Sequence, residues 1–317
     1  MTVAPDPLTA LNARPVATQT ARIEIYPFES LTLTDKQFLT GGKDGTRANI
    51  AGELRLPVGT AKIPAVILVH GSGGLGANVD QWASHLNGIG VAAFVVDSFT
   101  GRGITQTITD QSLLGSLTMI VDAYRALEIL AKHARIDEKQ IALMGFSKGG
   151  FVALYAGLKR FQRMYAPAGL EFCAYIPFYA PCNIVFLEDE EVSERPIRLF
   201  HGAADNYVSV GPCRKYVERL QKKGHDVRLT EYPGAQHVFD NPLYTPECFI
   251  AEAVTTSECL REERAGGEIV NLATGGEFHW DDPGVRRGAS VCYHPAATAQ
   301  AKTAVLTFLR DLFRLNA

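Results

Sequence analysis

The sequence predicts an α/β protein with a mostly parallel central sheet, helices on both of its faces and an antiparallel N-terminal edge. From about residue 65 onward, short apolar runs alternate with amphipathic helical patterns, which is the pattern of parallel strands joined by helical crossovers. Before that alternation, two strand-like stretches at 22–33 and 48–56 flank the turn sequence Gly41–Gly45. These two stretches are expected to pair antiparallel at one edge of the sheet.

The buried strands are expected where short apolar, often β-branched runs occur, and the helices where apolar residues recur at helical spacing. The expected strands are 65–69, 91–96, 141–144, 172–178, 197–200 and 227–232. The expected helices are 80–86, 113–130, 151–158, 214–222 and 296–315. Ligands bind at the carboxyl ends of strands in such sheets, so functional residues are expected just after strands.

Two segments fall outside this alternation. Residues 1–20 are rich in Pro, Ala and Thr and are predicted to be a flexible arm, followed by a single domain over 21–317. Residues 241–295 contain Pro, Gly and acidic residues without a clear period. We interpret them as an irregular insertion in the domain and a candidate lid.

Composition excludes several classes of function. The 317 residues are 46% hydrophobic and 21% charged, which is ordinary for a globular protein with a sizeable core. The net charge of -3 argues against nucleic acid and anionic membrane surfaces as partners, and no apolar run approaches the ~20 residues of a membrane span. The start lacks a signal-peptide pattern, which favours the cytoplasm, but six cysteines keep a periplasmic or secreted form with its leader removed open. Oligomeric state stays open.

The candidate nucleophile is Ser147. It lies in Gly145-Phe146-Ser147-Lys148-Gly149, a G-x-S-x-G motif directly after the expected strand 141–144 and directly before a helix. That context is the one a nucleophile elbow requires, because the tight turn needs small neighbours and exposes the hydroxyl at a helix N-terminus. The bland interpretation is a glycine-rich turn without catalysis.

A serine hydroxyl needs a base, and the chain order Ser, acid, His is typical of this kind of sheet. Asp205 follows the expected strand 197–200, and His237 follows the expected strand 227–232. His237 would take the serine proton, and Asp205 would hold the imidazole tautomer. Asp240 is a rival acid, ranked lower because it is close to His237 in sequence.

Two backbone N–H groups are candidates for an oxyanion hole, those of Ser72 in the glycine-rich loop after strand 65–69 and of Lys148 after the serine. Arg102 and Phe146 are candidate substrate-binding residues. Arg102 could clamp a substrate carboxylate, although pairing with a nearby acid for structure is the commoner use of such an arginine. The histidines and cysteines show no zinc-ligand spacing, and no phosphate-binding glycine motif occurs, so no metal or cofactor is expected.

These motifs resemble the dienelactone hydrolase family of the α/β-hydrolase superfamily, in its larger branch with a serine nucleophile. The resemblance spans about residues 22–315. It rests on Leu68–Gly74, Asp97–Phe99 with Arg102–Gly103, Gly145–Gly150, His201–Gly202 with Asp205, and Tyr232–Asp240. It implies the α/β-hydrolase fold and hydrolysis of esters or lactones. The type enzymes carry cysteine as nucleophile, so ester hydrolysis carries over to Ser147 but the dienelactone reaction itself does not.

The resemblance also implies a Cys182–Cys213 disulfide in an oxidising compartment, and more weakly a bond of Cys259 with Cys292 or Cys248. The sequence therefore predicts a carboxylic ester hydrolase acting on small-molecule esters or lactones through an acyl-enzyme on Ser147. A peptidase or thioesterase on the same fold is the alternative, because fold does not select the substrate. A non-catalytic binding module is a third interpretation.

Overall fold

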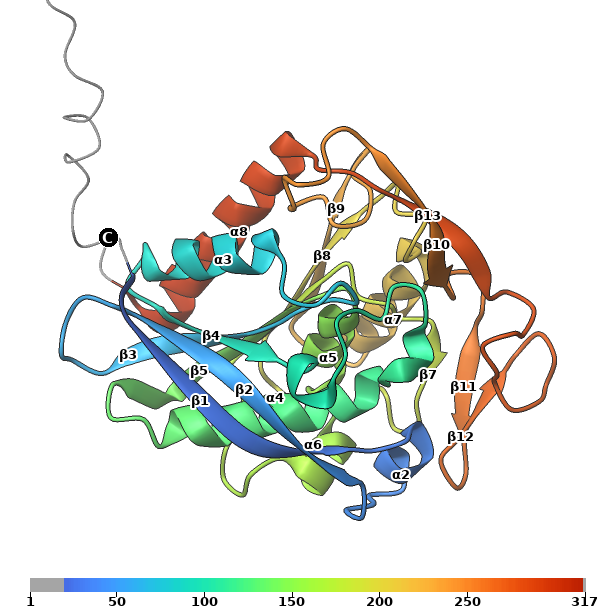
Figure 1. Ribbon diagram of the computed structural model, residues 1–317, viewed down its shortest axis with the longest axis horizontal. Coiled ribbons are helices and arrows are strands. Elements are labelled where there is room, and N and C mark those ends of the chain that lie inside the picture. Colours follow the sequence, from blue (N-terminus) through green and yellow to red (C-terminus); the bar gives the residue numbers. More distant parts are fainter. Residues whose placement is uncertain (1–19, 316–317) are drawn as a thin grey trace, which may run out of the picture.

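The computed structural model describes residues 20–315, and an eight-stranded sheet with helices on both faces forms its centre (Figure 1). The strand order is β1-β2-β4-β3-β5-β6-β8-β9. The first two pairings, β1 with β2 and β2 with β4, are antiparallel, and every later pairing in this sheet is parallel. The predicted fold class is therefore confirmed, including the antiparallel N-terminal edge.

The elements follow one another in the predicted alternation. The strands of the central sheet are β1 (Thr20–Thr32), β2 (Thr46–Pro57), β3 (Ile63–Val69), β4 (Ala92–Asp97), β5 (Ile136–Phe146), β6 (Tyr175–Phe178), β8 (Ile197–Gly202) and β9 (Val227–Tyr232). The helices are α2 (Asp35–Leu39), α3 (Ala77–Asn87), α4 (Ser116–Ala131), α5 (Lys148–Tyr155), α6 (Lys159–Tyr165), α7 (Val210–Lys222) and α8 (Pro295–Phe313), with short 3-10 turns at Thr100–Arg102 and Gln111–Leu113.

Two apolar cores hold the helices against the two faces of the sheet. Helices α3 and α8 pack on one face, where Trp82 and Leu309 are buried against apolar strand residues. Helices α4, α5 and α7 contribute to the core of the other face, which includes Leu127, Phe151 and Leu220. Burial of apolar area from water is the main stabilising term in such a layered fold. No helix within residues 20–315 is long and apolar enough to cross a membrane.

The segment 241–295 is more regular than expected. It contains β10 (Cys248–Thr255), β11 (Arg261–Arg264), β12 (Glu268–Asn271) and β13 (Arg286–Val291). Strands β10 and β13 form a two-stranded sheet, whereas β11 pairs with β12 and with β7 (Ile184–Val185), which precedes β8 in the chain. The sequence showed no clear period here because β11 and β12 have only four residues each, β10 does not alternate between buried and exposed residues, and β11 pairs with a distant segment.

Two further expectations concern the ends of the chain and the cysteines. All of the predicted arm except Thr20 lies outside the described residues, and the division into an arm and one domain stays a prediction. The expected disulfide Cys182–Cys213 is present, with 5.1 Å between the Cα atoms. The weaker pairing is wrong, because Cys248, Cys259 and Cys292 are all free thiols.

Candidate active site

Ser147 occupies a sharp turn between β5 and α5. Its backbone has φ 53° and ψ −112°, a strained conformation for a residue with a side chain. The turn is so tight that a Cβ on Gly145 would overlap the carbonyl oxygen of Gly149, and a Cβ on Gly149 would overlap that of Val69. The glycines of the motif are thus required by backbone contact, and the turn holds the half-buried Ser147 hydroxyl at the start of α5.

His237 lies in the loop after β9, and its ring bridges the serine and an acid. Its Nε2 atom is 2.9 Å from the Oγ atom of Ser147, and its Nδ1 atom is 2.7 Å from the Oδ2 atom of Asp205. The imidazole is 2% exposed. Segments 90 and 58 residues away from Ser147 therefore converge on it at the carboxyl ends of neighbouring parallel strands.

The carboxylate of Asp205 is fixed on both of its oxygens. Its Oδ1 atom accepts hydrogen bonds from the backbone N–H groups of Tyr207 at 2.9 Å and Val208 at 2.8 Å, while Oδ2 faces His237. Burial opposes ionisation of this group, but the charge and hydrogen bonds of His237 and His201 outweigh it and hold the pKa of Asp205 well below its usual range. Asp205 is therefore a carboxylate that accepts a proton poorly.

The rival acid Asp240 does not face the imidazole. Its buried carboxyl accepts hydrogen bonds from the indole N–H of Trp82 at 2.8 Å and from the hydroxyl of Tyr179 at 2.7 Å. Burial raises the pKa of Asp240. Asp240 lies three residues after His237 and points toward α3. This position agrees with the sequence analysis, which ranked Asp240 below Asp205 as the candidate acid.

Arg102 is a correction to the predicted substrate-binding set. Its guanidinium donates to both carboxylate oxygens of Asp122, at 2.8 and 2.9 Å, and also to Thr32 and to the carbonyl oxygens of Leu31 and Ser98. The side chain is 4% exposed and all of these partners are protein groups. A clamp on a substrate carboxylate is therefore wrong, and Arg102 instead ties β1 to α4.

The two candidate oxyanion donors lie beside the serine. A Cβ on Gly71 would come within 3.3 Å of the Cβ of Ser147, so the loop that carries Ser72 passes directly by the nucleophile. The buried His70 ring is 2.8 Å from the carbonyl oxygen of Gly71, which fixes the Gly71–Ser72 peptide plane. The N–H of Lys148 belongs to the first turn of α5, where it has no intrahelical acceptor.

Comparison with known proteins identifies the family to which this chain belongs. The model of the dienelactone hydrolase family matches residues 50–270. The chain belongs to the dienelactone hydrolase family. As a member of this family it is a carboxylic ester hydrolase, and its hydrolytic activity is directed at esters or lactones.

The proteins to which this chain is similar share only a small fraction of its residues. A Bradyrhizobium sp protein named "Probable 2-oxo-3-(5-oxofuran-2-ylidene)propanoate lactonase" is 24% identical over 203 residues, which are 59% of this chain and 80% of the relative. A dienelactone hydrolase-like promiscuous phosphotriesterase from metagenomic libraries superposes with a TM-score of 0.61, 18% identity and coverage of 92% of this chain and 99% of that one. Esterase 2 of Thermogutta terrifontis, phosphorylated by paraoxon, superposes with a TM-score of 0.52 and 20% identity, and the match covers 71% of this chain and 87% of that one. The solved structures show the shared fold.

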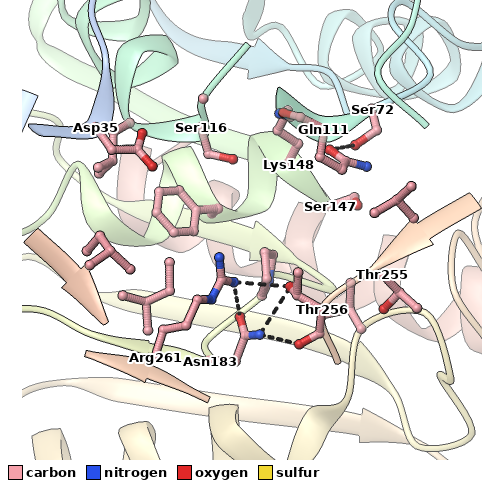
Figure 2. Close-up of a pocket in the computed structure, with 18 of the residues that line it drawn as sticks. Asp35, Ser72, Gln111, Ser116, Ser147, Lys148, Asn183, Thr255, Thr256 and Arg261 are labelled. Atoms are coloured by element: carbon pink, nitrogen blue, oxygen red, sulfur yellow. Dashed lines mark hydrogen bonds between the residues drawn. The ribbon is translucent and has the colours of Figure 1, made fainter. Parts of the chain in front are cut away.

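Two cavities meet at Ser147 in this family member. The first, of about 110 Å³, is the Arg261 cavity; charged and polar side chains from several elements line it, including Asp35, Lys148, Asn183, Thr256 and Arg261 (Figure 2). The second, of about 100 Å³, is the His237 cavity; its wall includes His237 and the apolar side chains of Ile108, Phe146, Val238, Ile250 and Val291. No Asp, Glu, Lys or Arg of the described chain borders this second cavity.

Phe146 remains a candidate in a limited sense. Its ring is 1% exposed and packs against Phe178 at 5.5 Å between ring centroids, so it belongs to the core as well as to the wall of the His237 cavity. The segment 241–295 borders both cavities through residues such as Thr256 and Ile250. Its action as a lid stays a proposal.

Three side chains of the site were not singled out in the sequence. Tyr179 and Tyr207 flank His237, each with 4.8 Å between ring centroids. Both follow strand ends, so the rule that located Asp205 and His237 also points to them. Arg261 had no such signal, because its strand lies in the segment without a readable period.

The buried ammonium group of Lys148 gives a pH-dependent prediction for stability. It donates to the carbonyl oxygens of Leu114 and Gln111, and burial lowers its pKa to about 8. Between that value and the ordinary value near 10.4, the unfolded chain binds more protons than the native protein, so stability rises with pH. The free energy of unfolding of the wild type minus that of Lys148→Met should be constant below pH 8. From pH 8 toward the ordinary lysine pKa, this difference should rise by about 1.4 kcal/mol per pH unit. Urea unfolding at pH 7, 8, 9 and 10 measures this, and a constant difference between the two proteins would contradict it.

Proposed function

We propose that this protein cleaves carboxylic esters through an acyl-enzyme on Ser147, with His237 as general base and acid and Asp205 as its orienting partner. The observation that supports this most is the continuous chain of contacts, 2.9 Å from Ser147 Oγ to His237 Nε2 and 2.7 Å from His237 Nδ1 to Asp205 Oδ2. Both distances lie within the reach that proton transfer and tautomer control need.

In the first half-reaction, the Ser147 oxygen attacks the ester carbonyl carbon while its proton passes to Nε2 of His237. The carbonyl oxygen becomes an oxyanion, which the N–H groups of Ser72 and Lys148 stabilise. When the carbon–oxygen bond to the alcohol breaks, the imidazolium returns that proton to the leaving alkoxide. A water molecule, deprotonated by His237, then attacks the acyl-enzyme, and the acid and free serine are released.

Asp205 serves this cycle through its position and its charge. Its carboxylate accepts from Nδ1, which leaves Nε2 free of its proton and turned toward the serine. Because its pKa is held well below the usual range, it stabilises the imidazolium as an ion without taking the proton.

Lactones fit the same mechanism, since they are cyclic esters whose alcohol part stays attached to the acyl-enzyme. The name of the Bradyrhizobium relative specifies a lactone substrate, which favours including lactones beside open-chain esters. Peptidase and thioesterase action use the same groups and remain alternatives that the fold alone does not separate.

A substrate panel at equal enzyme concentration tests the proposal. It contains p-nitrophenyl acetate and butyrate, a five-membered enol lactone, an acyl thioester and a chromogenic peptide. We expect the highest kcat/KM for an ester or the lactone. A higher value for the peptide or thioester would replace the proposed substrate class, and no turnover of any compound would revive the binding-module interpretation.

A further inference from the structure

Arg261 is a buried cation whose hydrogen-bonding capacity is only partly used. The residue is 8% exposed and lies at the start of β11, with its guanidinium over the ring of Phe278 at 4.6 Å. Its Nη2 atom donates to Asn183 Oδ1 at 3.3 Å and to Thr256 Oγ1 at 3.1 Å. Its Nε atom has no hydrogen-bond partner, and within residues 20–315 the guanidinium forms no ion pair.

This incomplete pairing is unusual for a buried arginine. A guanidinium stays charged in proteins, and removing it from water is costly unless a carboxylate or similar group compensates. The side chain is nevertheless held in place, because the amide of Asn183 also donates to the carbonyl oxygens of Thr256 at 2.6 Å and Cys259 at 2.9 Å. The guanidinium is therefore fixed at the wall of the cavity that leads to Ser147 (Figure 2).

Among the described residues that line the Arg261 cavity, cations outnumber carboxylates. Arg261 and Lys148 are two cations in its wall, and Asp35 is the one carboxylate among the lining residues that the structure describes; the charges of Asp35 and Asp110 both act on Lys148. Figure 2 shows Asp35 beside Ser116, across the cavity from Arg261. A carboxylate in this cavity would supply the ionic partner that Arg261 lacks within residues 20–315, and its planar shape matches the geometry of a guanidinium.

The two cavities also differ in which end of an ester each would take. The proton that His237 returns goes to the leaving alcohol, so the alcohol part belongs in the cavity that His237 borders. Among the described residues, the side chains in the wall of that cavity are uncharged: apolar groups such as Ile108 and Val291 and polar ones such as Asn78 and Asn241. The acyl part then extends from Ser147 into the Arg261 cavity.

We propose that the substrates are half-esters of dicarboxylic acids, in which Arg261 binds the free carboxylate of the acyl part and a small uncharged alcohol occupies the His237 cavity. This inference rests on the proposed function of Ser147. The reaction adds one water to the half-ester; the ester carbon–oxygen bond breaks, and the products are the alcohol and the dicarboxylate, with one proton released to solvent at neutral pH. Asn183 and Thr256 act as positioning residues that hold the guanidinium.

Three substrates of similar size separate the charge from the shape. Monoethyl glutarate carries the proposed acyl carboxylate, ethyl 5-oxohexanoate replaces that carboxylate by a neutral acetyl group, and 5-acetoxypentanoate is an isomer with the carboxylate on the alcohol part. Hydrolysis is followed by chromatography of the products. We expect wild-type kcat/KM for monoethyl glutarate to exceed both others by roughly 10- to 100-fold, the range of one charged hydrogen-bonding interaction.

The variant Arg261→Met keeps the aliphatic length and removes the charge. It should abolish the preference for monoethyl glutarate by lowering kcat/KM for that substrate far more than for ethyl 5-oxohexanoate. Arg264→Met is the matched control: it removes a cation from the same strand, but Arg264 is 51% exposed at its side chain and pairs with Glu262. This control should keep the wild-type preference.

Equal wild-type rates for the charged and neutral ethyl esters, or an equal loss on both in Arg261→Met, would overturn the role of Arg261. A preference for 5-acetoxypentanoate would overturn the assigned orientation. Hydrolysis of p-nitrophenyl acetate by the wild-type enzyme and by Ser147→Ala is measured in parallel. A wild-type enzyme that hydrolyses p-nitrophenyl acetate but shows no preference for monoethyl glutarate counts against this inference alone, whereas an active Ser147→Ala protein counts against the proposed function itself.

Discussion

Ser147→Ala is expected to lower kcat for p-nitrophenyl butyrate by on the order of 10⁶, to the level that binding and the oxyanion donors alone provide. The substitution removes the atom that attacks the carbonyl carbon, and His237 then has no serine proton to accept. It leaves the strained turn and both candidate oxyanion N–H groups in place. Steady-state rates, with far-UV circular dichroism as a check on folding, measure the effect.

Ser72→Ala is the matched control for this experiment. Ser72 also borders both cavities, but its hydroxyl donates to Gln111 at 3.1 Å, and only its backbone N–H has a role in the mechanism. We therefore expect kcat within a few-fold of wild type for this variant. A Ser147→Ala protein with nearly wild-type turnover would show that another residue carries the reaction.

The second large effect is expected at Asp205, where Asn should lower kcat by on the order of 10⁴ with little change in KM. The amide nearly matches the carboxylate in size and can still accept the N–H groups of Tyr207 and Val208 through its oxygen. It would then present an NH₂ group to Nδ1 of His237, which favours the tautomer with the proton on Nε2. That tautomer cannot accept the serine proton.

Asp240→Asn tests whether the right acid has been assigned. Asp240 accepts from Trp82 and Tyr179 and does not touch the imidazole ring, so its amide variant should change kcat far less than Asp205→Asn does. A larger loss at Asp240 than at Asp205 would contradict the assignment. Thermal unfolding of both variants separates loss of turnover from loss of stability.

The positions of the candidate catalytic residues could be predicted from the sequence because the rule that locates them is local. Ser147, Asp205 and His237 each follow a strand within a few residues, and parallel strands bring such positions to one edge. Neither α2 nor α6 was expected; α2 has five residues and starts with a capping box of Thr34 and Gln37, a signal too short to read as periodicity.

The side-chain partners of the arginines were harder to foresee. Arg102 follows a strand end as the three triad candidates do, but its partner Asp122 lies 20 residues later, on the inner face of α4. Arg261 gains its place from β11 pairing with β7, which is more than 70 residues earlier in the chain. Such long-range pairings determine which arginine has a carboxylate partner and which one faces a cavity. They cannot be predicted from composition or from the spacing of motifs.

Covalent labelling with a fluorophosphonate tests the central claim most directly, because the reagent reacts with a serine only when its hydroxyl is activated. The account predicts one adduct per chain in the intact mass, located on the peptide that contains Ser147, and none in Ser147→Ala at the same reagent concentration. A wild-type protein that stays unmodified, or an adduct on another residue that persists in Ser147→Ala, would contradict it.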